Sequence, residues 1–170
     1  DGCLYFPPCF ATRVLRFDPK TEQATFIGPD LGPGFKYYGA VTARNGRIYG
    51  VPTCATRVLR IDPTTQSVEL VGPDLSESIW KWTGGVEAMD GFIYCMPNLA
   101  PRKRVLRIDP TTDEIEMIGP DIPLHNQGFE LAALGADGCT YSAAPKALRV
   151  DAPTNGQPLS VELVGPTLDP

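Results

Sequence analysis

The chain has 170 residues, of which 42% are hydrophobic and 21% charged, and its formal net charge is −5. This length is enough for one domain with a buried core. The acidic balance argues against nucleic-acid binding, which needs a basic surface. No segment approaches the 18 apolar residues of a membrane-spanning helix, so we expect no membrane span.

One heptapeptide recurs along the chain and sets its period. It reads Arg-Val-Leu-Arg-Phe-Asp-Pro at 13–19, Arg-Val-Leu-Arg-Ile-Asp-Pro at 57–63 and 104–110, and Ala-Leu-Arg-Val-Asp-Ala-Pro at 147–153. Each copy follows an Asp-Gly or Asn-Gly pair and precedes a short apolar run that ends in Gly-Pro. Repeats of this length indicate a repeat architecture.

Each repeat unit is predicted to form four short strands. In the second unit they are expected at about 37–44, 47–53, 57–62 and 67–72, the last ending at Gly72-Pro73. The Asn-Gly or Asp-Gly pair between the first two strands predicts a type I′ hairpin turn, and the Asp-Pro-x-Thr segment between the last two predicts a type I turn. No stretch has a sustained 3.6-residue apolar period and 18 prolines interrupt the chain, so helix is not expected.

Four antiparallel strands in about 45 residues, repeated, are typical of the blades of a β-propeller. The order of a Gly-Val strand, an Asp-Gly turn, an Ile-Tyr strand and a Val-Leu-Arg-Ile-Asp-Pro strand resembles NHL and kelch-like propeller repeats. The residue sequence of the repeat is also similar to that of repeat proteins of dinoflagellate algae. The resemblance implies an all-β propeller of four repeats, at approximately 1–34, 35–78, 79–124 and 125–170.

The first unit starts at the turn after its innermost strand, so that strand is missing. We expect three full blades and one of three strands. Three interpretations remain open: an excerpt of a longer propeller, a four-bladed ring with an incomplete blade, or a dimer whose sheet edges pair.

Loops at one end of the strands vary in length and are rich in aromatic residues, both tryptophans included. Variable loops on a rigid scaffold are where binding usually occurs. Flat aromatic rings beside a cation suit a protein partner, a sugar face or an acidic group. Packing of these rings between blades is the alternative, above all for Tyr37 and Trp82. The predicted binding residues are Lys36, Tyr37, Tyr38, Trp80, Lys81, Trp82, His125 and Phe129.

The sequence predicts a non-catalytic interaction module or accessory subunit that binds a protein partner through this aromatic face. The alternative is a propeller that binds a glycan or a small molecule, and a metal-dependent hydrolase is the third reading. Catalytic residues, cofactors and metal ligands are not expected, because the chain has one His and few acids on its inner strands. Glu87 and Glu130 could act as general acid and base only if both faced the channel.

Two other patterns are interpreted structurally. The repeated Arg and Asp of the heptapeptide are expected to pair between blades rather than to form an anion-binding ring. The five cysteines lack a metal-ligand spacing and are expected to be reduced thiols that pack in the core. A soft-metal site of Cys9, Cys54 and His125 is a weaker reading.

Overall fold

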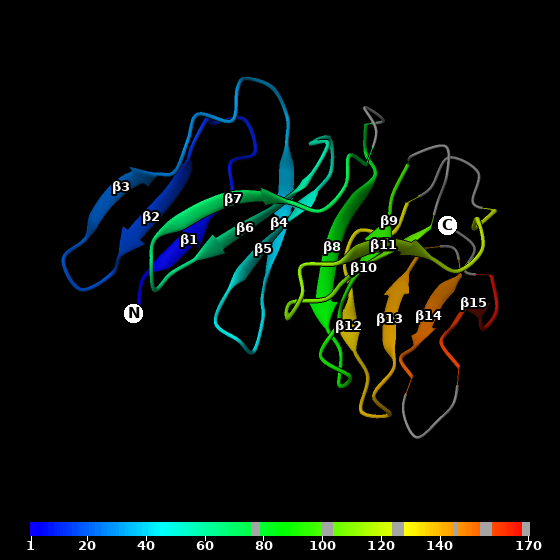
Figure 1. The fold of residues 1–170 in the computed structure, drawn as a ribbon. Helices are drawn as coiled ribbons and strands as arrows, with labels where there is room; N and C mark the ends of the chain where they lie inside the picture. Colours follow the sequence, from blue (N-terminus) through cyan, green and yellow to red (C-terminus); the bar gives the residue numbers. More distant parts are fainter. Residues whose placement is uncertain (76–78, 100–103, 124–127, 145, 154–157, 168–170) are drawn as a thin grey trace.

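The computed structural model describes residues 1–75, 79–99, 104–123, 128–144, 146–153 and 158–167 (Figure 1). These residues form 15 β-strands in four antiparallel sheets. The prediction of an all-β propeller built from four repeats, the first without its innermost strand, is confirmed. No helix in the described part of the chain could cross a membrane.

The four sheets follow the four repeats in chain order. The first holds β1 (Leu4–Phe6), β2 (Val14–Asp18) and β3 (Gln23–Ile27). The second holds β4 (Tyr37–Thr42), β5 (Ile48–Pro52), β6 (Val58–Asp62) and β7 (Ser67–Val71). The third holds β8 (Trp82–Glu87), β9 (Ile93–Pro97), β10 (Val105–Ile108) and β11 (Ile115–Ile118). The fourth holds β12 (Ala133–Leu134), β13 (Thr140–Ala143), β14 (Ala147–Asp151) and β15 (Ser160–Val164).

The sheets lie next to one another as successive blades. The innermost strands β4 and β12 both contact β8, and the first and fourth sheets lie at opposite ends of the array (Figure 1). Each blade between these ends is therefore covered on both faces by its neighbours. This explains why β5 and β9 are buried at every residue, without the alternation of a half-exposed strand.

The hairpin between the first two strands of each blade differs from the predicted type I′ turn. Of its two central residues only the glycine has a positive φ, as in Gly46 (85°) and Gly91 (87°). The Gly46 amide donates to the Ala43 carbonyl at 2.9 Å, and the Ala43 amide donates to Arg47 at 2.8 Å. This is a type I turn followed by a left-handed glycine, the usual form of a slightly longer hairpin loop.

The Asp-Pro-x-Thr turns form as the sequence predicts. The Asp18, Asp62 and Asp109 carboxylates each accept a hydrogen bond from the backbone amide two residues later, at 2.9, 2.9 and 2.7 Å. These bonds stabilise the charged form and lower the pKa of Asp18 and Asp62. The carboxylates are therefore engaged within their own turns.

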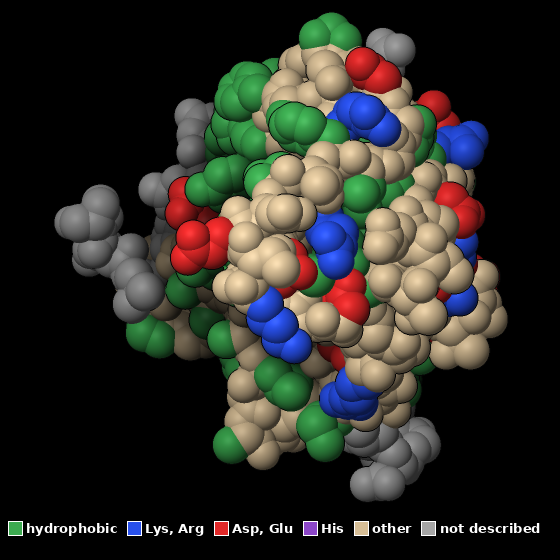
Figure 2. Space-filling view, turned by 90° about the vertical axis from the view of Figure 1, so that its left-hand side faces the viewer, with side chains coloured by type: hydrophobic (Ala, Val, Ile, Leu, Met, Phe, Trp, Pro, Cys, Tyr) green, Lys and Arg blue, Asp and Glu red, His purple; other side chains and the backbone are tan. Residues whose placement is uncertain are grey.

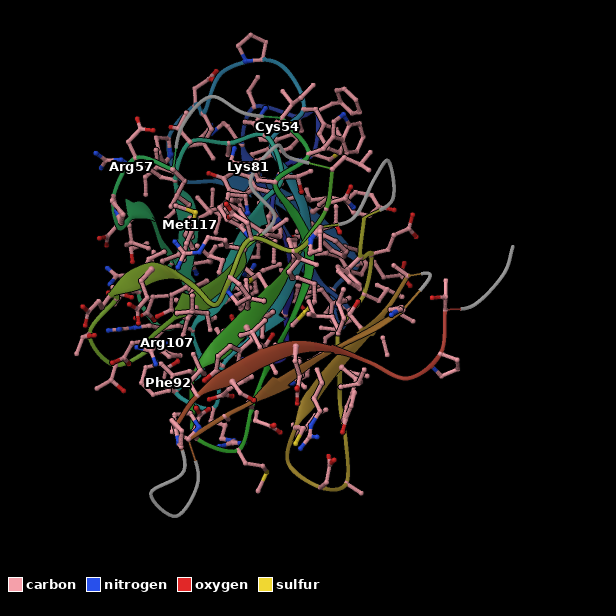
Figure 3. All side chains as sticks on the ribbon, turned by 90° about the vertical axis from the view of Figure 1, so that its right-hand side faces the viewer. Cys54, Arg57, Lys81, Phe92, Arg107 and Met117 are labelled. Carbon is pink, nitrogen blue, oxygen red and sulfur yellow. The ribbon has the colours of Figure 1, made fainter. Side chains whose placement is uncertain are left out.

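The repeated arginines do not form one ring, and their partners differ from blade to blade. Arg60 pairs with Glu69 on its own sheet at 2.7 Å and with Asp113 of the next blade. Arg107 pairs with Glu116 and lies over the Phe92 ring at 4.6 Å, which Figure 3 shows. Arg149 is the one that pairs with the Asp of its own heptapeptide, Asp151.

Neighbouring blades interlock through the Gly-Pro segments. A Cβ built on Gly28 would lie 2.5 Å from the Val68 Cβ of the next blade, and one on Gly119 would lie 2.7 Å from the Val161 Cβ. Gly72 meets the Ile115 side chain in the same way. In the second, third and fourth blades, a β-branched residue near the start of the outer strand thus packs into a space that glycine leaves open on the preceding blade.

The core lies between the sheets, and Cys95 on β9 belongs to one of its buried clusters and has no exposed surface. All five cysteines are free thiols. Burial raises the pKa of the Cys95 thiol from its ordinary value of 9.0 to about 12.

This shift predicts a loss of stability in alkali. In the unfolded chain the Cys95 thiol ionises from about pH 9, whereas in the folded chain it stays neutral to about pH 12. The neutral thiol's contribution to the free energy of unfolding is therefore complete below pH 9 and is lost as the pH rises from 9 towards 12. Urea unfolding at stepped pH should show a steeper alkaline fall for the native chain than for Cys95→Val. Equal pH dependence would contradict the assignment.

Candidate functional site

A pocket of about 320 Å³ opens at the end of the blades where the innermost strands begin. Its wall joins the second, third and fourth blades, because β4 and β8 each start directly after a loop that crosses this end. The residues that line it are Phe35, Tyr38, Trp80, Thr83, Asn98, Leu99 and Glu130. The volume is within the range of small-molecule sites, about 300–1,000 Å³.

Aromatic rings form one side of the pocket. Phe35 and Trp80 occupy equivalent positions, each directly before a Lys, in neighbouring blades. Their ring centroids are 4.9 Å apart with an interplanar angle of 39°. Tyr38 stacks on Phe35 at 6.2 Å, and Phe10 meets the other edge of Phe35 at 5.2 Å. The repeat thus brings rings from two blades into one cluster.

The Trp80 backbone is unusual. Its φ is 57°, in the left-handed region that an aromatic residue rarely adopts. The other described non-glycine residues with positive φ, Glu22, Gln66 and Asp113, all lie at one equivalent position in the Asp-Pro-x-Thr turns. Trp80 is outside such a turn, and its conformation costs about 1–2 kcal/mol. The fold holds the Trp80 ring against Phe35 in spite of that cost.

Polar groups also line the pocket. The Asn98 amide donates to Thr83 Oγ1 at 3.1 Å and to the Phe129 carbonyl at 3.2 Å. Thr83 Oγ1 in turn donates to the Phe129 carbonyl at 2.8 Å. Glu130 is exposed, and its carboxylate has no hydrogen bond or ion pair with any described residue. Asn98 and Thr83 are therefore fixed, while Glu130 can accept a hydrogen bond from a ligand.

Two lysines beside the aromatic residues are buried. Lys36 Nζ donates to the Gly32 and Gly34 carbonyls, each at 2.8 Å, so its charge is directed into its own loop. Lys81 lies beside Cys54 at this end of the molecule (Figure 3). Burial lowers the pKa of both ammonium groups. Neither lysine lines the pocket.

Tyr37 and Trp82 lie at equivalent positions and are 3% and 2% exposed. The Tyr37 hydroxyl donates to the Arg57 carbonyl at 3.2 Å, and Trp82 Nε1 donates to the Arg104 carbonyl at 2.8 Å. Each ring thus bridges the start of its innermost strand to the start of the third strand of the same blade. Phe129 is fully buried at the matching place in the fourth blade.

Of the predicted binding residues, the structure brings Tyr38 and Trp80 together in the pocket. Lys36, Tyr37, Lys81, Trp82 and Phe129 lie beneath or beside it, and His125 lies outside the described residues. Sequence reasoning did not select Phe35, Thr83, Asn98 or Leu99. Phe35 could have been found by aligning it with Trp80, whereas Asn98 and Leu99 follow a strand that carries no binding pattern.

Glu87 and Glu130 do not face each other across a channel. Glu87 ends β8 at the hairpin side, where its carboxylate accepts the Arg44 amide at 2.8 Å, while Glu130 precedes β12 at the opposite end. In the described part of the chain, no three His, Cys, Asp or Glu side chains are grouped to hold a metal. Neither an acid–base pair nor a metal centre is therefore visible in those residues.

Comparison with solved structures identifies the scaffold. Virginiamycin B lyase from Staphylococcus aureus matches with a TM-score of 0.73 and 14% identity over 99% of this chain and 53% of the lyase. A streptogramin B lyase matches at 0.68 and 17% over 95% of this chain and 51% of its own. An auxiliary nutrient binding protein from Bacteroides ovatus matches at 0.66 and 13% over 99% of this chain and 40% of its own. The chain shares their fold.

The chain spans about half the length of the lyases it matches. At these identities the likeness shows the fold alone. No protein-family model matches the chain, and no curated protein matches it either. The finer resemblance to NHL or kelch-like repeats therefore stays a prediction.

These matches correct one expectation. The sequence predicted that the chain is not an enzyme, because it is poor in His and in inner-strand acids. That prediction is overturned by the similarity to two lyases, since the shared scaffold includes enzymes. The scaffold also includes binding proteins, so a binding module fits it equally well.

Proposed function

We propose that this chain is a binding module that takes a small amphipathic molecule with a flat apolar face, such as a sugar ring or an aromatic group, into the aromatic pocket. The observation that carries the proposal is the Phe35–Trp80 ring pair, 4.9 Å between centroids, in a pocket that the polar side chains of Asn98 and Glu130 also line. A site with one apolar and one polar wall fixes both the position and the orientation of such a ligand.

The two walls have separate roles. Trp80 and Tyr38 are 41% and 56% exposed, so a ligand that stacks on them removes apolar surface from water. Glu130 accepts a hydrogen bond from a hydroxyl or amine of the ligand. The stacked rings and the bonded Asn98–Thr83 pair are ordered before binding, which lowers the entropy cost of association.

The test is a fluorescence titration with one emitting tryptophan. Trp82→Phe leaves Trp80 as the reporter, and the probes are a panel of mono- and disaccharides and of planar aromatic acids and amines. A probe that binds should shift the emission of Trp80. Calorimetry should show that Trp80→Ala, Tyr38→Ala and Glu130→Gln each raise the Kd for that probe about tenfold. Phe26→Ala, which removes an exposed aromatic ring on β3, is the control. Unchanged emission across the panel would count against the proposal.

A protein partner is the second candidate, and the surface around the pocket favours it. Phe10, Ile79, Leu99 and Leu131 are 69%, 62%, 48% and 76% exposed. Phe10 contacts Phe35, Leu99 lines the pocket, and the other two adjoin Trp80 and Glu130 in sequence. Exposed apolar side chains around a pocket are typical of a protein–protein site. Loss of partner binding in Leu131→Ser, with small-ligand binding intact, would support this second candidate.

A further inference from the structure

Among the described side chains that line the aromatic pocket, Glu130 alone is charged. Its carboxylate has no ion pair with any described residue. The two lysines near the pocket do not line it: Lys36 Nζ donates to carbonyls of its own loop, and Lys81 is 3% exposed. A carboxylate attracts a positively charged group and repels an anion. The charge of the pocket therefore favours a cationic ligand.

The two buried polar residues of the pocket, Asn98 and Thr83, have directed their hydrogen-bond donors into the protein. Asn98 Nδ2 carries two hydrogens and donates to Thr83 Oγ1 at 3.1 Å and to the Phe129 carbonyl at 3.2 Å. The Thr83 hydroxyl carries one hydrogen, which is directed at the Phe129 and Glu130 carbonyls, at 2.8 and 3.2 Å. The groups that these two side chains can still offer to a ligand are acceptors: Asn98 Oδ1 and a lone pair of Thr83 Oγ1.

The aromatic rings of the pocket also suit a cation. The face of a Trp or Tyr ring attracts a positive charge that lies within about 6 Å of the ring centroid. Trp80 and Tyr38 are both partly exposed, so a ligand can reach them. The chain already contains one contact of this kind, in which Arg107 lies over the Phe92 ring at 4.6 Å. On the side of the molecule that Figure 2 shows, hydrophobic side chains gather over the upper half, the end at which β4 and β8 begin (Figure 1).

We propose that the pocket selects an organic cation, a small molecule with a primary ammonium group attached to a flat apolar ring. The ammonium group pairs with Glu130 and donates to the acceptors of Asn98 and Thr83, while the ring stacks on Trp80. This inference rests on the proposed function, that the pocket binds a small molecule, and it narrows the class of ligand. A primary ammonium group brings three donors and no acceptor, which matches the acceptors that the polar side chains offer.

The experiment is calorimetry of the native chain with four probes that share one phenethyl group. Phenethylamine is protonated at neutral pH, as a Lys side chain is, whereas phenethyl alcohol is neutral and hydrocinnamate is negative. Phenethyltrimethylammonium has the positive charge without N–H donors. The Kd of the amine should be at least about tenfold lower than that of the alcohol. The Kd of the trimethylammonium probe should lie between these two, and hydrocinnamate should bind more weakly than the alcohol.

Two variants test whether Glu130 supplies the opposite charge. Glu130→Gln keeps the shape of the side chain and removes its charge, so it should bring the Kd of the amine to within about threefold of that of the alcohol. The matched control is Glu114→Gln, which removes the same charge from an exposed residue between β10 and β11, at the other end of the blades. It should leave the tenfold preference for the amine unchanged. In the native chain, added salt should weaken the binding of the amine more than that of the alcohol.

The outcomes separate this inference from the proposed function. Equal Kd values for the amine and the alcohol, or tighter binding of hydrocinnamate, would overturn the preference for a cation and leave the binding of a small molecule standing. Binding of the saccharide probes but of none of the four phenethyl probes would do the same. If neither the phenethyl probes nor the saccharides and planar aromatic probes bind, the proposed function is wrong, and the preference for a cation is wrong with it.

Discussion

Replacing Gly72 by Ala is expected to lower the free energy of unfolding by about 2–5 kcal/mol. Two costs add. At a φ of 77° an L-residue is strained, by about 1–2 kcal/mol. The new Cβ also occupies the space of the Ile115 side chain, and overpacking of this kind costs about 1–3 kcal/mol. This is a large part of the total stability of an ordinary domain, about 5–15 kcal/mol.

Gly165→Ala separates the two costs. Gly165 has the same φ of 77°, but no heavy atom of the described residues lies within 4 Å of the added Cβ. Gly165→Ala should lower the free energy of unfolding in urea only by the strain, about 1–2 kcal/mol. Equal losses in the two variants would show that Ile115 moves aside freely, and that the Gly-Pro segments do not lock the blades.

The strands could be predicted from the sequence because their limits depend on local chemistry. The Asp of each Asp-Pro-x-Thr segment bonds to an amide two residues away, so the turn forms wherever the segment occurs. The predicted hairpin type was wrong because an Asn-Gly or Asp-Gly pair fits two loops: a type I′ turn with both residues left-handed, and a type I turn followed by one left-handed glycine. The contact of Gly28 with Val68 joins residues 40 positions apart, and one sequence gives no local signal for it.

The pocket could be predicted only in part for the same reason. The repeat places equivalent aromatic residues at the same end of neighbouring blades, so Tyr38 and Trp80 were expected there. The choice between a ring that faces solvent and one that packs inward depends on a single position: Trp80 is 41% exposed and Trp82 is 2% exposed. Trp82 is the first residue of the extended strand β8, whereas Trp80 has a left-handed backbone that no local sequence motif predicts.

Trp82→Ala and Trp80→Ala should therefore differ strongly in how much they lower the free energy of unfolding. Trp82→Ala removes a ring that is buried between β8 and the start of β10 and the donor to the Arg104 carbonyl, so it should cost about 3–5 kcal/mol. Trp80→Ala removes a partly exposed ring that packs on Phe35. It should cost about 1 kcal/mol or less, because such ring pairs contribute about 0.5–1.5 kcal/mol.

The measurement is chemical unfolding of both variants, followed by circular dichroism, together with the ligand titration of the folded protein. The Trp80 variant should keep the native unfolding midpoint within a small shift and lose binding, because its ring is a wall of the pocket. For the Trp82 variant, the fraction of protein that binds ligand should follow the fraction that is folded. A Trp80 variant that unfolds as readily as the Trp82 variant would make Trp80 a packing residue, and the aromatic pocket would lose the ring on which ligand stacking depends.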